Sequence, residues 1–432
     1  MATKQWTGAA PAVAQVQTWA FAGTWEANDL IRATIGGKTV DFTAGSTTTA
    51  TVVSNLVTAW NALSQSVYPE FTGTSDGATA SANSTTFTLT AKKAGVPFIV
   101  TLTPLESNGG SADSQTIEGG TSATTGTQST ASSGPNHWDA TGNWSGGAIP
   151  VDTDDIVFSN SSIDCLYGIS QSSIDLASLK IEQSYTGKIG LADHNGLYPE
   201  YRTKDLTLGT VTLLEIGKGI GNGSQRIRLD VGSNACTLNM LNSGSSSEAG
   251  AEPVLWKGTH ASNVVNVSKG QLGIATRPGE TATVATLRVG YLSNQAGDST
   301  VRCGAGTTLT TIEQAGGRLE INSAVTTLGI TGGDCVFNGS AAMTTLNADG
   351  GKVHYRSSGT LTTANVGDDA ELDFSQDMRD RTVTNCTLSS DAKLADPFGT
   401  VTFTNPMTLN RCGLKDVDLD LGTHITIARA AA

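Results

Sequence analysis

A short phrase recurs through the C-terminal half of the chain, and it constrains the fold more than any other feature of the sequence. Each copy has two threonines and an apolar residue, then a Gly-Gly pair, then a segment of alternating side chains. The copies begin at Thr310, Thr326 and Thr344. A short strand cannot bury its apolar face alone, so near-identical units at this spacing predict neighbours that stack into a parallel β-solenoid.

The composition agrees with stacked strands and limits the partners. The chain has 432 residues, of which 50 are glycine and only 15% are charged. Its 39 acidic and 26 basic residues give a formal net charge of -13. Nucleic acids and anionic membranes both require a basic face on the protein that binds them. We therefore expect neither nucleic acid nor membrane as a partner.

The two ends of the sequence bear on localisation. Residues Met1 to Trp6 do not read as a secretory signal, and Ile427 to Ala432 do not read as an anchor. No apolar run approaches the length needed to cross a bilayer. We expect a protein that is made in the cytoplasm and either stays there or leaves inside a larger particle.

The chain divides into four parts by composition. Residues 1–15 are expected to form an N-terminal arm, residues 16–106 a small α+β domain, residues 107–134 a Ser/Thr/Gly linker, and residues 135–432 the parallel β-helix. We take the β-helix as right-handed because parallel crossover connections generally are. Two tryptophans, Trp138 and Trp144, precede the first solenoid strand and are suited to cover its open end.

The small domain is predicted from one hairpin, one helix and further strands. Residues 29–35 and 38–42 flank Gly36-Gly37, which indicates a two-residue hairpin turn. After Thr47 to Thr49, apolar residues at helical spacing predict one helix. These residues are Val53, Leu56, Trp60, Leu63 and Val67. Strands are expected at residues 85–90 and 97–102, so the helix would lie on a sheet.

No motif for catalysis, metal or cofactor binding emerges. The six cysteines include no C-x-x-C pair, and we interpret them as buried free thiols. The five histidines lack zinc spacing, and a hydrolase nucleophile elbow is missing. The densest acidic cluster, between Asp368 and Asp380, has the residue types of a glycosidase carboxylate pair. Few aromatic residues accompany it, so solvated acidic turns are the favoured interpretation.

One loop has the composition of a protein contact surface. It is Ala192 to Arg202, in which aromatic and charged side chains alternate with turn residues. We select six residues as a candidate protein interface: Trp6, His194, Tyr198, Glu200, Tyr201 and Arg202.

Two segments resemble bacteriophage proteins. Asp29 to Leu102, with its Ile-Gly-Gly-Lys hairpin, a helix ending near Trp60-Asn61-Ala62 and a later Phe-Thr-Leu-Thr-Ala-Lys-Lys stretch, resembles a small domain of phage virion proteins. The segment around Asn143-Trp144-Ser145-Gly146-Gly147 is similar to β-helical proteins of phage structural regions. The resemblance supplies no catalytic residue, but it implies a place in the virion.

The resemblance and the composition together lead to a functional expectation. We expect a non-enzymatic capsid decoration protein that binds the major capsid protein or other virion proteins and self-associates as a homotrimer. The alternative is a tail fibre or tailspike that binds, or cleaves, a host surface glycan. A bacterial surface adhesin would require a secretion signal or an anchor, which the sequence does not indicate.

Overall fold

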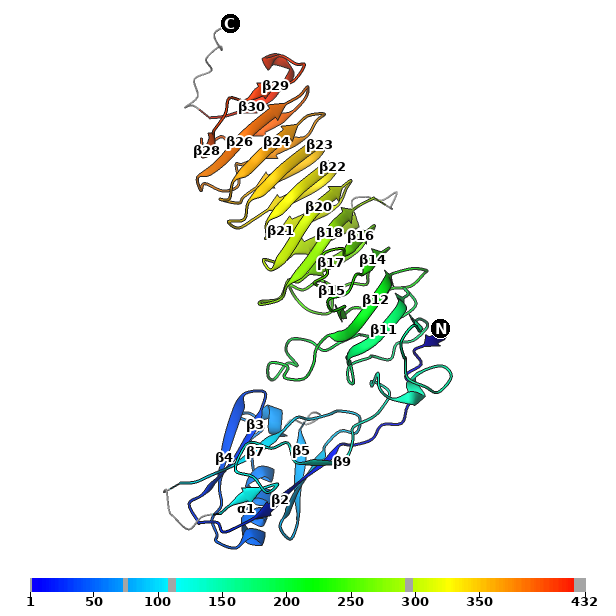
Figure 1. Ribbon diagram of the computed structural model, residues 1–432, viewed down its shortest axis with the longest axis vertical. Coiled ribbons are helices and arrows are strands. Elements are labelled where there is room, and N and C mark those ends of the chain that lie inside the picture. The colour runs from blue at the N-terminus through cyan, green and yellow to red at the C-terminus, as the bar shows by residue number, and fades with distance from the viewer. Residues whose placement is uncertain (1, 73–76, 108–113, 292–297, 423–432) are drawn as a thin grey trace.

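Parallel backbone pairing dominates the structure. The computed structural model describes residues 2–72, 77–107, 114–291 and 298–422. Within these ranges, 22 strands form one parallel sheet, in which most strands pair with the strand two places further along the chain. Such pairing arises when each strand lies over its counterpart in the preceding coil, so the sheet is compatible with a β-helix. We call the region that this sheet builds the solenoid (Figure 1).

The solenoid takes one strand from the N-terminus and the others from the second part of the chain. Its strands are β1 (Thr3–Gln5), β10 (Asp155–Phe158), β11 (Ser170–Ile181), β12 (Leu206–Ile216), β13 (Ile227–Asp230), β14 (Thr237–Met240), β15 (Val254–Lys257), β16 (Val264–Val267), β17 (Gly270–Ile274), β18 (Ala282–Val289), β19 (Ser299–Cys303), β20 (Thr307–Gln314), β21 (Arg318–Ile321), β22 (Val325–Phe337), β23 (Met343–Tyr355), β24 (Leu361–Val366), β25 (Glu371–Asp373), β26 (Arg381–Leu388), β27 (Lys393–Ala395), β28 (Val401–Phe403), β29 (Thr408–Leu409) and β30 (Asp418–Asp420). Two short 3-10 helices, η1 (Thr141–Asn143) and η3 (Leu414–Asp416), lie in the connections.

The repeated phrase of the sequence falls on successive coils, as predicted. Leu328 in β22 pairs with Leu346 in β23, which pairs with Ala364 in β24, and all three side chains are buried. The glycine pair forms a corner. Gly333 has a φ of 93°, and a Cβ there would lie 2.5 Å from the carbonyl oxygen of Gly317. A side chain at this position would therefore be strained and would also collide with the neighbouring coil.

An outward column of charged residues supports the register. The signs alternate from coil to coil through Arg318, Asp334, Lys352, Glu371, Lys393 and Asp418. The Lys352 ammonium lies 2.7 Å from Glu371, and Arg318 lies 3.6 Å from Asp334. Opposite charges at facing positions of neighbouring strands attract, so the column favours the observed alignment.

The N-terminal end of the solenoid is closed by β1 and by tryptophans. β1 pairs with β10, so Thr3–Gln5 form a solenoid strand where the sequence predicted part of an N-terminal arm. Trp6, Trp138 and Trp144 are almost fully buried, with Trp144 lying 5.1 Å from Trp6 and 4.7 Å from Trp138 between ring centroids. The prediction that Trp138 and Trp144 cover this end is confirmed. Trp6 joins them because an open coil end exposes apolar side chains that need a cover.

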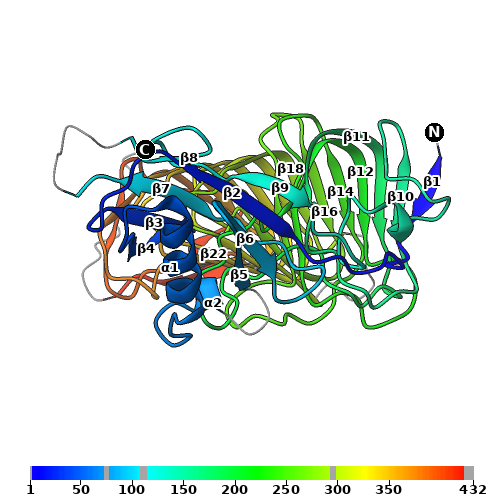
Figure 2. The same cartoon turned by 90° about the horizontal axis from the view of Figure 1, so that it is seen from below.

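The chain between β1 and the rest of the solenoid forms a separate N-terminal region, which is therefore an insertion (Figures 1 and 2). One sheet has the order β5-β6-β2-β8, with β9 also paired to β2, and the other has the order β4-β3-β7. Its elements are β2 (Val16–Ala22), β3 (Leu30–Ile35), β4 (Lys38–Thr43), α1 (Thr49–Asn61), α2 (Pro69–Thr72), β5 (Ala78–Asn83), β6 (Thr86–Ala91), β7 (Thr101–Leu105), β8 (Thr116–Ile117) and β9 (Thr127–Thr130). Side chains of α1 and of both sheets share one apolar core.

The predicted linker over 107–134 is corrected by the structure. Its described part contributes β8 and β9, which both pair with β2, and Ile117 is fully buried. The segment is rich in Ser, Thr and Gly and so lacks an apolar pattern. Backbone pairing along an existing strand does not require such a pattern, which is why composition alone indicated a linker.

The hairpin and the helix are observed, although the helix is shorter than predicted. Gly36 and Gly37 form the turn between β3 and β4 with φ values of 55° and 87°. α1 buries Val53, Leu56 and Trp60 as expected, but it ends at Asn61, and Val67 is 53% exposed. α1 ends well before Pro69, which begins α2.

The last residue of α1 protects an edge strand. β5 lies at the edge of its sheet, where unpaired backbone groups invite association with other chains. The Asn61 side chain donates to the carbonyl of Ala80 at 2.9 Å and accepts from its N–H at 3.0 Å. The indole of Trp60 donates to the carbonyl of Ala78 at 3.1 Å. Side chains thus occupy the edge positions that a partner strand would use.

We predict that Asn61→Leu will promote self-association. The substitution removes two hydrogen bonds, each worth about 1 kcal/mol, and frees the outward groups of Ala80. Light scattering during incubation at 37 °C should show faster aggregation than in the wild type. Gln65→Leu is the control, because it adds a similar apolar side chain at an exposed position just beyond the helix. Equal aggregation of both variants would contradict the protective role of Asn61.

We predict that Trp6→Ala will destabilise the solenoid by about 3–5 kcal/mol, because it leaves a cavity beside Trp144 and Phe158. Guanidinium chloride unfolding, followed by intrinsic fluorescence, measures the change. Thr3→Ala, in the adjoining strand β1, replaces an exposed side chain and should be nearly neutral. A stability unchanged by Trp6→Ala would show that β1 is not part of the closed end.

Candidate functional site at the junction of the two regions

Two chain segments connect the N-terminal region to the solenoid, and they are held together by hydrogen bonds. Val13 and Ser133 form an antiparallel bridge, with Val13 N–H donating to the Ser133 carbonyl at 2.7 Å. Asn143, which is fully buried, accepts from the N–H of Ala10 at 2.8 Å. Its amide also donates to the carbonyls of Gly134 and His137 at 2.8 and 2.7 Å. One side chain therefore ties the outgoing segment to the returning one.

A third connection is the loop that the sequence indicated as a contact surface. The Arg202 guanidinium makes two hydrogen bonds of 2.8 Å to the Glu200 carboxylate and one of 3.2 Å to the carbonyl of Pro97 in the N-terminal region. It also lies 5.4 and 5.2 Å from the ring centroids of Tyr167 and Tyr201. Burial alone would lower the pKa of Arg202, but the Glu200 carboxylate and the two rings raise it above its usual range. The guanidinium therefore stays charged and bridges the two regions.

The same loop meets the turn of the β3–β4 hairpin. Tyr201 packs against the apolar core of the N-terminal region. A Cβ added to Gly36 would lie 2.5 Å from the Cβ of Tyr201. Glycine at position 36 therefore serves both the left-handed turn and the close approach of Tyr201.

The six predicted interface residues have different surroundings. Trp6 closes the solenoid end, and its indole donates to the carbonyl of Ile163 at 3.0 Å. Tyr198, Glu200 and Arg202 are buried, and Tyr201 is half-buried. His194 is exposed and accepts from the N–H of Gly196 through Nδ1 at 3.1 Å. The loop composition did indicate a desolvated contact, but the buried residues make that contact within the chain, so they do not offer a surface to another protein.

An ion network anchors the base of this loop to the solenoid. Asp193 lies 2.8 Å from Arg228 and 3.0 Å from Lys204, and Arg228 also lies 2.5 Å from Glu248. Arg228 is only 1% exposed. Burial would raise the pKa of Asp193, yet hydrogen bonds from Arg228 and Lys204 hold it well below its usual range. The carboxylate thus remains ionised and keeps the loop attached.

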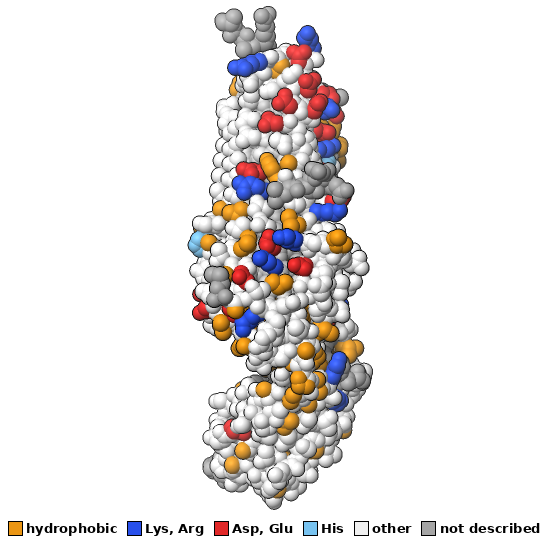
Figure 3. Space-filling model, turned by 90° about the vertical axis from the view of Figure 1, so that its right-hand side faces the viewer, with side chains coloured by type: hydrophobic (Ala, Val, Ile, Leu, Met, Phe, Trp, Pro, Cys, Tyr) orange, Lys and Arg blue, Asp and Glu red, His pale blue; other side chains and the backbone are white. Residues whose placement is uncertain are grey.

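The network extends along one groove, where acidic and basic side chains nearly balance. Lys257 lies within 3.5 Å of Asp205, Asp230 and Glu280, and Arg277 pairs with Asp205 and Glu280. These side chains line a groove of about 560 Å³. Charged groups of both signs gather over the solenoid, while the N-terminal region shows few on the face drawn in Figure 3. Because the charges nearly cancel, the groove does not favour a strongly charged ligand.

Within the acidic cluster of residues 368–380, Glu371, Asp373 and Asp377 are ion-paired, and Asp368, Asp369 and Asp380 are exposed. Asp373 is 3% exposed and accepts from the N–H of Ser375 at 2.8 Å, and it lies 2.9 Å from His354 and 3.3 Å from Lys352. Asp377 lies 2.7 Å from Arg379. Hydrogen bonds from Arg379 lower the pKa of Asp377 to about 2. For Asp373, burial opposes ionisation, but hydrogen bonds from Ser375 and Lys352 still lower its pKa.

Five of the six cysteines are buried, as the sequence predicted, and Cys412 is not. Cys165, Cys236, Cys303, Cys335 and Cys386 are buried free thiols, and Cys412 is partly exposed. Burial raises the pKa of Cys303 and Cys386 to about 12. A thiol with such a pKa is protonated at neutral pH and is a poor nucleophile, so these residues act as core side chains.

We predict that Arg202→Met will destabilise the protein by about 3–5 kcal/mol, because it leaves Glu200 buried without its cation. Guanidinium chloride unfolding measures the loss, and limited proteolysis should cut near residues 8–15 faster than in the wild type. The double variant Glu200→Gln/Arg202→Met removes both charges and should cost clearly less. Thr203→Ala, at an exposed neighbour, is the control. Equal stability of the single and double variants would contradict the ion-pair account.

We predict that stability will fall in acid as the carboxylates of the acidic cluster are protonated. The pKa values of Asp373 and Asp377 are lower in the folded state than the unfolded value of about 3.9. Their contribution is therefore complete above about pH 4 and is lost as pH falls through the folded values. Thermal unfolding between about pH 5 and pH 2 should show a smaller decline for Asp373→Asn than for wild type. The exposed Asp380→Asn is the control, and identical profiles for all three proteins would refute the assignment.

Comparisons with known proteins do not assign this chain to a protein family. In the ranges that the structure describes, no helix is both long enough and apolar enough to cross a bilayer, and no three His, Cys, Asp or Glu residues are grouped to hold a metal ion. Comparison with protein-family models, with curated proteins and with solved structures found no match in any of the three. The functional conclusion therefore depends on the sequence and on the geometry described above.

Proposed function

We propose that this protein is a non-enzymatic structural component of a bacteriophage virion, attached to the outside of the head as a capsid decoration protein. Its partner would be the major capsid protein or another virion protein. The proposal needs no cofactor, metal, nucleic acid or membrane. The observation that carries it is the architecture: a long parallel solenoid is joined to an inserted N-terminal region through two chain segments and a buried ion pair. Two stretches of the sequence resemble phage proteins, Asp29 to Leu102 and the stretch around Asn143 to Gly147, and this resemblance points to the same role.

Finer features of the fold belong to the same proposal. We infer that the solenoid is a right-handed β-helix, as parallel crossovers usually are. We also infer that the inserted region is a small α+β domain of the kind found in phage virion proteins. Its shared apolar core of helix and sheet side chains supports this inference.

The state of the carboxylates argues against the glycan-cleaving alternative. A glycosidase needs one carboxylic acid whose raised pKa keeps it protonated, beside a second carboxylate. In the acidic cluster, the pKa values of Asp373 and Asp377 are lowered, and both groups are engaged by cations. If Asp373→Asn or Glu371→Gln abolished a measurable depolymerase activity, the non-enzymatic proposal would fail.

Immunogold labelling of phage particles, with antibodies against this protein, tests the location. We expect gold particles spread over the head. Gold confined to the tail would favour the alternative, a tail fibre or tailspike that binds a host surface glycan. Particles from a phage that lacks the coding sequence are the control for antibody specificity.

We further predict that the protein forms a homotrimer. The solenoid offers a long lateral surface with ion-paired side chains and little net charge in its groove, which is compatible with side-by-side packing. Light scattering coupled to size-exclusion chromatography should give three times the chain mass of 44.4 kDa. A monomer at micromolar concentration would contradict this prediction.

A further inference from the structure

One face of the solenoid carries no charged side chain over four successive coils. It is formed by strand segments of β22, β23, β24 and β26 that contain no Asp, Glu, Lys or Arg: residues 325–331, 343–348, 361–366 and 382–388. The parallel register aligns Thr327, Thr345, Thr363 and Asn385 in one outward column. Most other outward side chains of these segments are also threonine or asparagine. We call this surface the Thr/Asn face.

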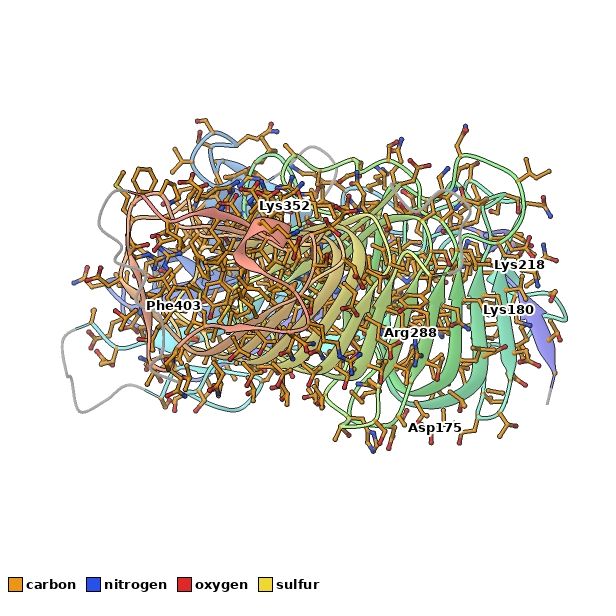
Figure 4. The ribbon with its side chains drawn as sticks, turned by 90° about the horizontal axis from the view of Figure 1, so that it is seen from above. Asp175, Lys180, Lys218, Arg288, Lys352 and Phe403 are labelled. Carbon is orange, nitrogen blue, oxygen red and sulfur yellow. The ribbon has the colours of Figure 1, made fainter. Side chains whose placement is uncertain are left out.

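The charges of the same coils lie on a different face. There the Lys352 ammonium lies 2.7 Å from Glu371 in the next coil. Figure 4 looks along the solenoid and shows Lys352 on a different side of the coils from Arg288. Arg288 belongs to the column that continues through Glu313 and Gly329 into the Thr/Asn face. The coils therefore separate an ion-paired face from an uncharged one.

Pairs of outward residues form a ridge along the Thr/Asn face. In β23, Met343 and Leu346 are buried, whereas Thr344 and Thr345 between them point outward. Two successive outward residues break the alternation of a straight strand, so the strand turns at this point. The same step recurs in the neighbouring coils at Thr326-Thr327, Thr362-Thr363 and Thr384-Asn385. The Thr/Asn face therefore consists of two flanks that meet at a ridge.

The side chains of this face are short, neutral and repeated from coil to coil. Asn365 donates to the side-chain oxygen of Asn347 at 2.8 Å, so amides stack along the solenoid. Threonine has few rotamers, and burying it costs less conformational entropy than burying the lysines and glutamates of the ion-paired face. A partner that matches the whole face needs uncharged donors and acceptors at the strand spacing of about 4.8 Å. A second copy of this chain has both properties.

The charge of the chain favours the same contact. Each copy has a formal net charge of -13, so copies repel one another in general. Contact through the exposed turn at Asp368 and Asp369 would bring like charges together. Contact through the Thr/Asn face would not, because the segments that form it are uncharged.

We propose that copies of this chain pack side by side through the Thr/Asn face, with the ridge directed towards the axis of the homotrimer. Two flanks that meet at a ridge suit a closed ring, because one flank of each copy can contact the other flank of the next copy. The inference rests on the proposed homotrimer and not on the proposed location on the head. It leaves the ion-paired face, with Lys352 and Glu371, on the outside of the assembly.

A single added charge on the full-length protein tests the proposal. Thr344→Lys places an ammonium group on the ridge, where the copies would bury it, so we expect the trimer to dissociate into chains of 44.4 kDa. Light scattering coupled to size-exclusion chromatography measures the mass. The matched control is Gln271→Lys, at an exposed strand position in the same column as Lys352. Both variants make the chain less acidic, so weaker general repulsion alone would favour association in both.

Circular dichroism verifies that each variant is folded. If Thr344→Lys fails to fold, Thr362→Lys makes the same change at an exposed ridge position of the next coil.

The outcomes separate this inference from the proposals on which it rests. A trimeric wild type and control with a dissociated Thr344→Lys variant supports the Thr/Asn face. Trimers in all three proteins would overturn this face and leave the homotrimer standing, and dissociation of both variants would overturn it as well. A monomeric wild type would overturn the homotrimer and the face together. The location on the virion would still be decided by immunogold labelling.

Discussion

Each coil of the solenoid is held by the coils against which it packs, and this mutual dependence determines the rest of the structure. Backbone groups of a parallel strand pair with strands on both sides. The inward-facing apolar side chains are shielded from water only where the next coil covers them. Columns such as Leu328–Leu346–Ala364 remain buried from coil to coil for this reason. The same dependence makes both ends of the stack critical, because an unfinished coil exposes a strand edge and a core at once.

The closure of the N-terminal end explains the unusual order of the regions. β1 pairs with β10 in the solenoid, whereas the next strands along the chain, β2 to β9, belong to two other sheets. The N-terminal region is therefore inserted between two solenoid segments. The buried side-chain amide of Asn143 is hydrogen-bonded to both of the segments that connect this region to the solenoid. The Glu200–Arg202 pair adds a third contact from a later coil. A region attached at three places keeps a defined orientation relative to the solenoid.

Local repetition in the sequence was sufficient to predict the stacked coils. The sequence was not sufficient to predict contacts between residues that are far apart in the chain. The Thr-Thr and Gly-Gly phrases predicted stacked coils because neighbours in the stack are also neighbours in the sequence. The Gly36-Gly37 hairpin, the α1 face around Leu56 and the buried cysteines followed from short patterns in the same way. The position of Trp6 could not be predicted in this way, because nothing near it in the chain indicates a contact with Trp144. The segment around Thr127 was interpreted as a linker because strands that join an existing sheet need no apolar period.

The candidate interface also combines a feature that the sequence predicts with one that it does not. Tyr201 and Arg202 have the composition of a desolvated contact, and they do form one, but the sequence cannot distinguish a contact within the chain from one between chains. Asn143 and Asn61 carry structural roles that become visible only once Ala10 and Ala80 are placed beside them. A buried or edge-facing asparagine has no periodic signal in a single sequence.

The contacts between the N-terminal region and the solenoid imply that the two form one rigid elongated body. Small-angle X-ray scattering of the purified chain tests this most directly, at a series of concentrations that defines the oligomeric state. We expect one conformation, with the N-terminal region fixed against the loop of residues 192–202, to fit the full scattering curve. A curve that fits only a mixture of orientations, as expected for a region on a flexible linker, would contradict it.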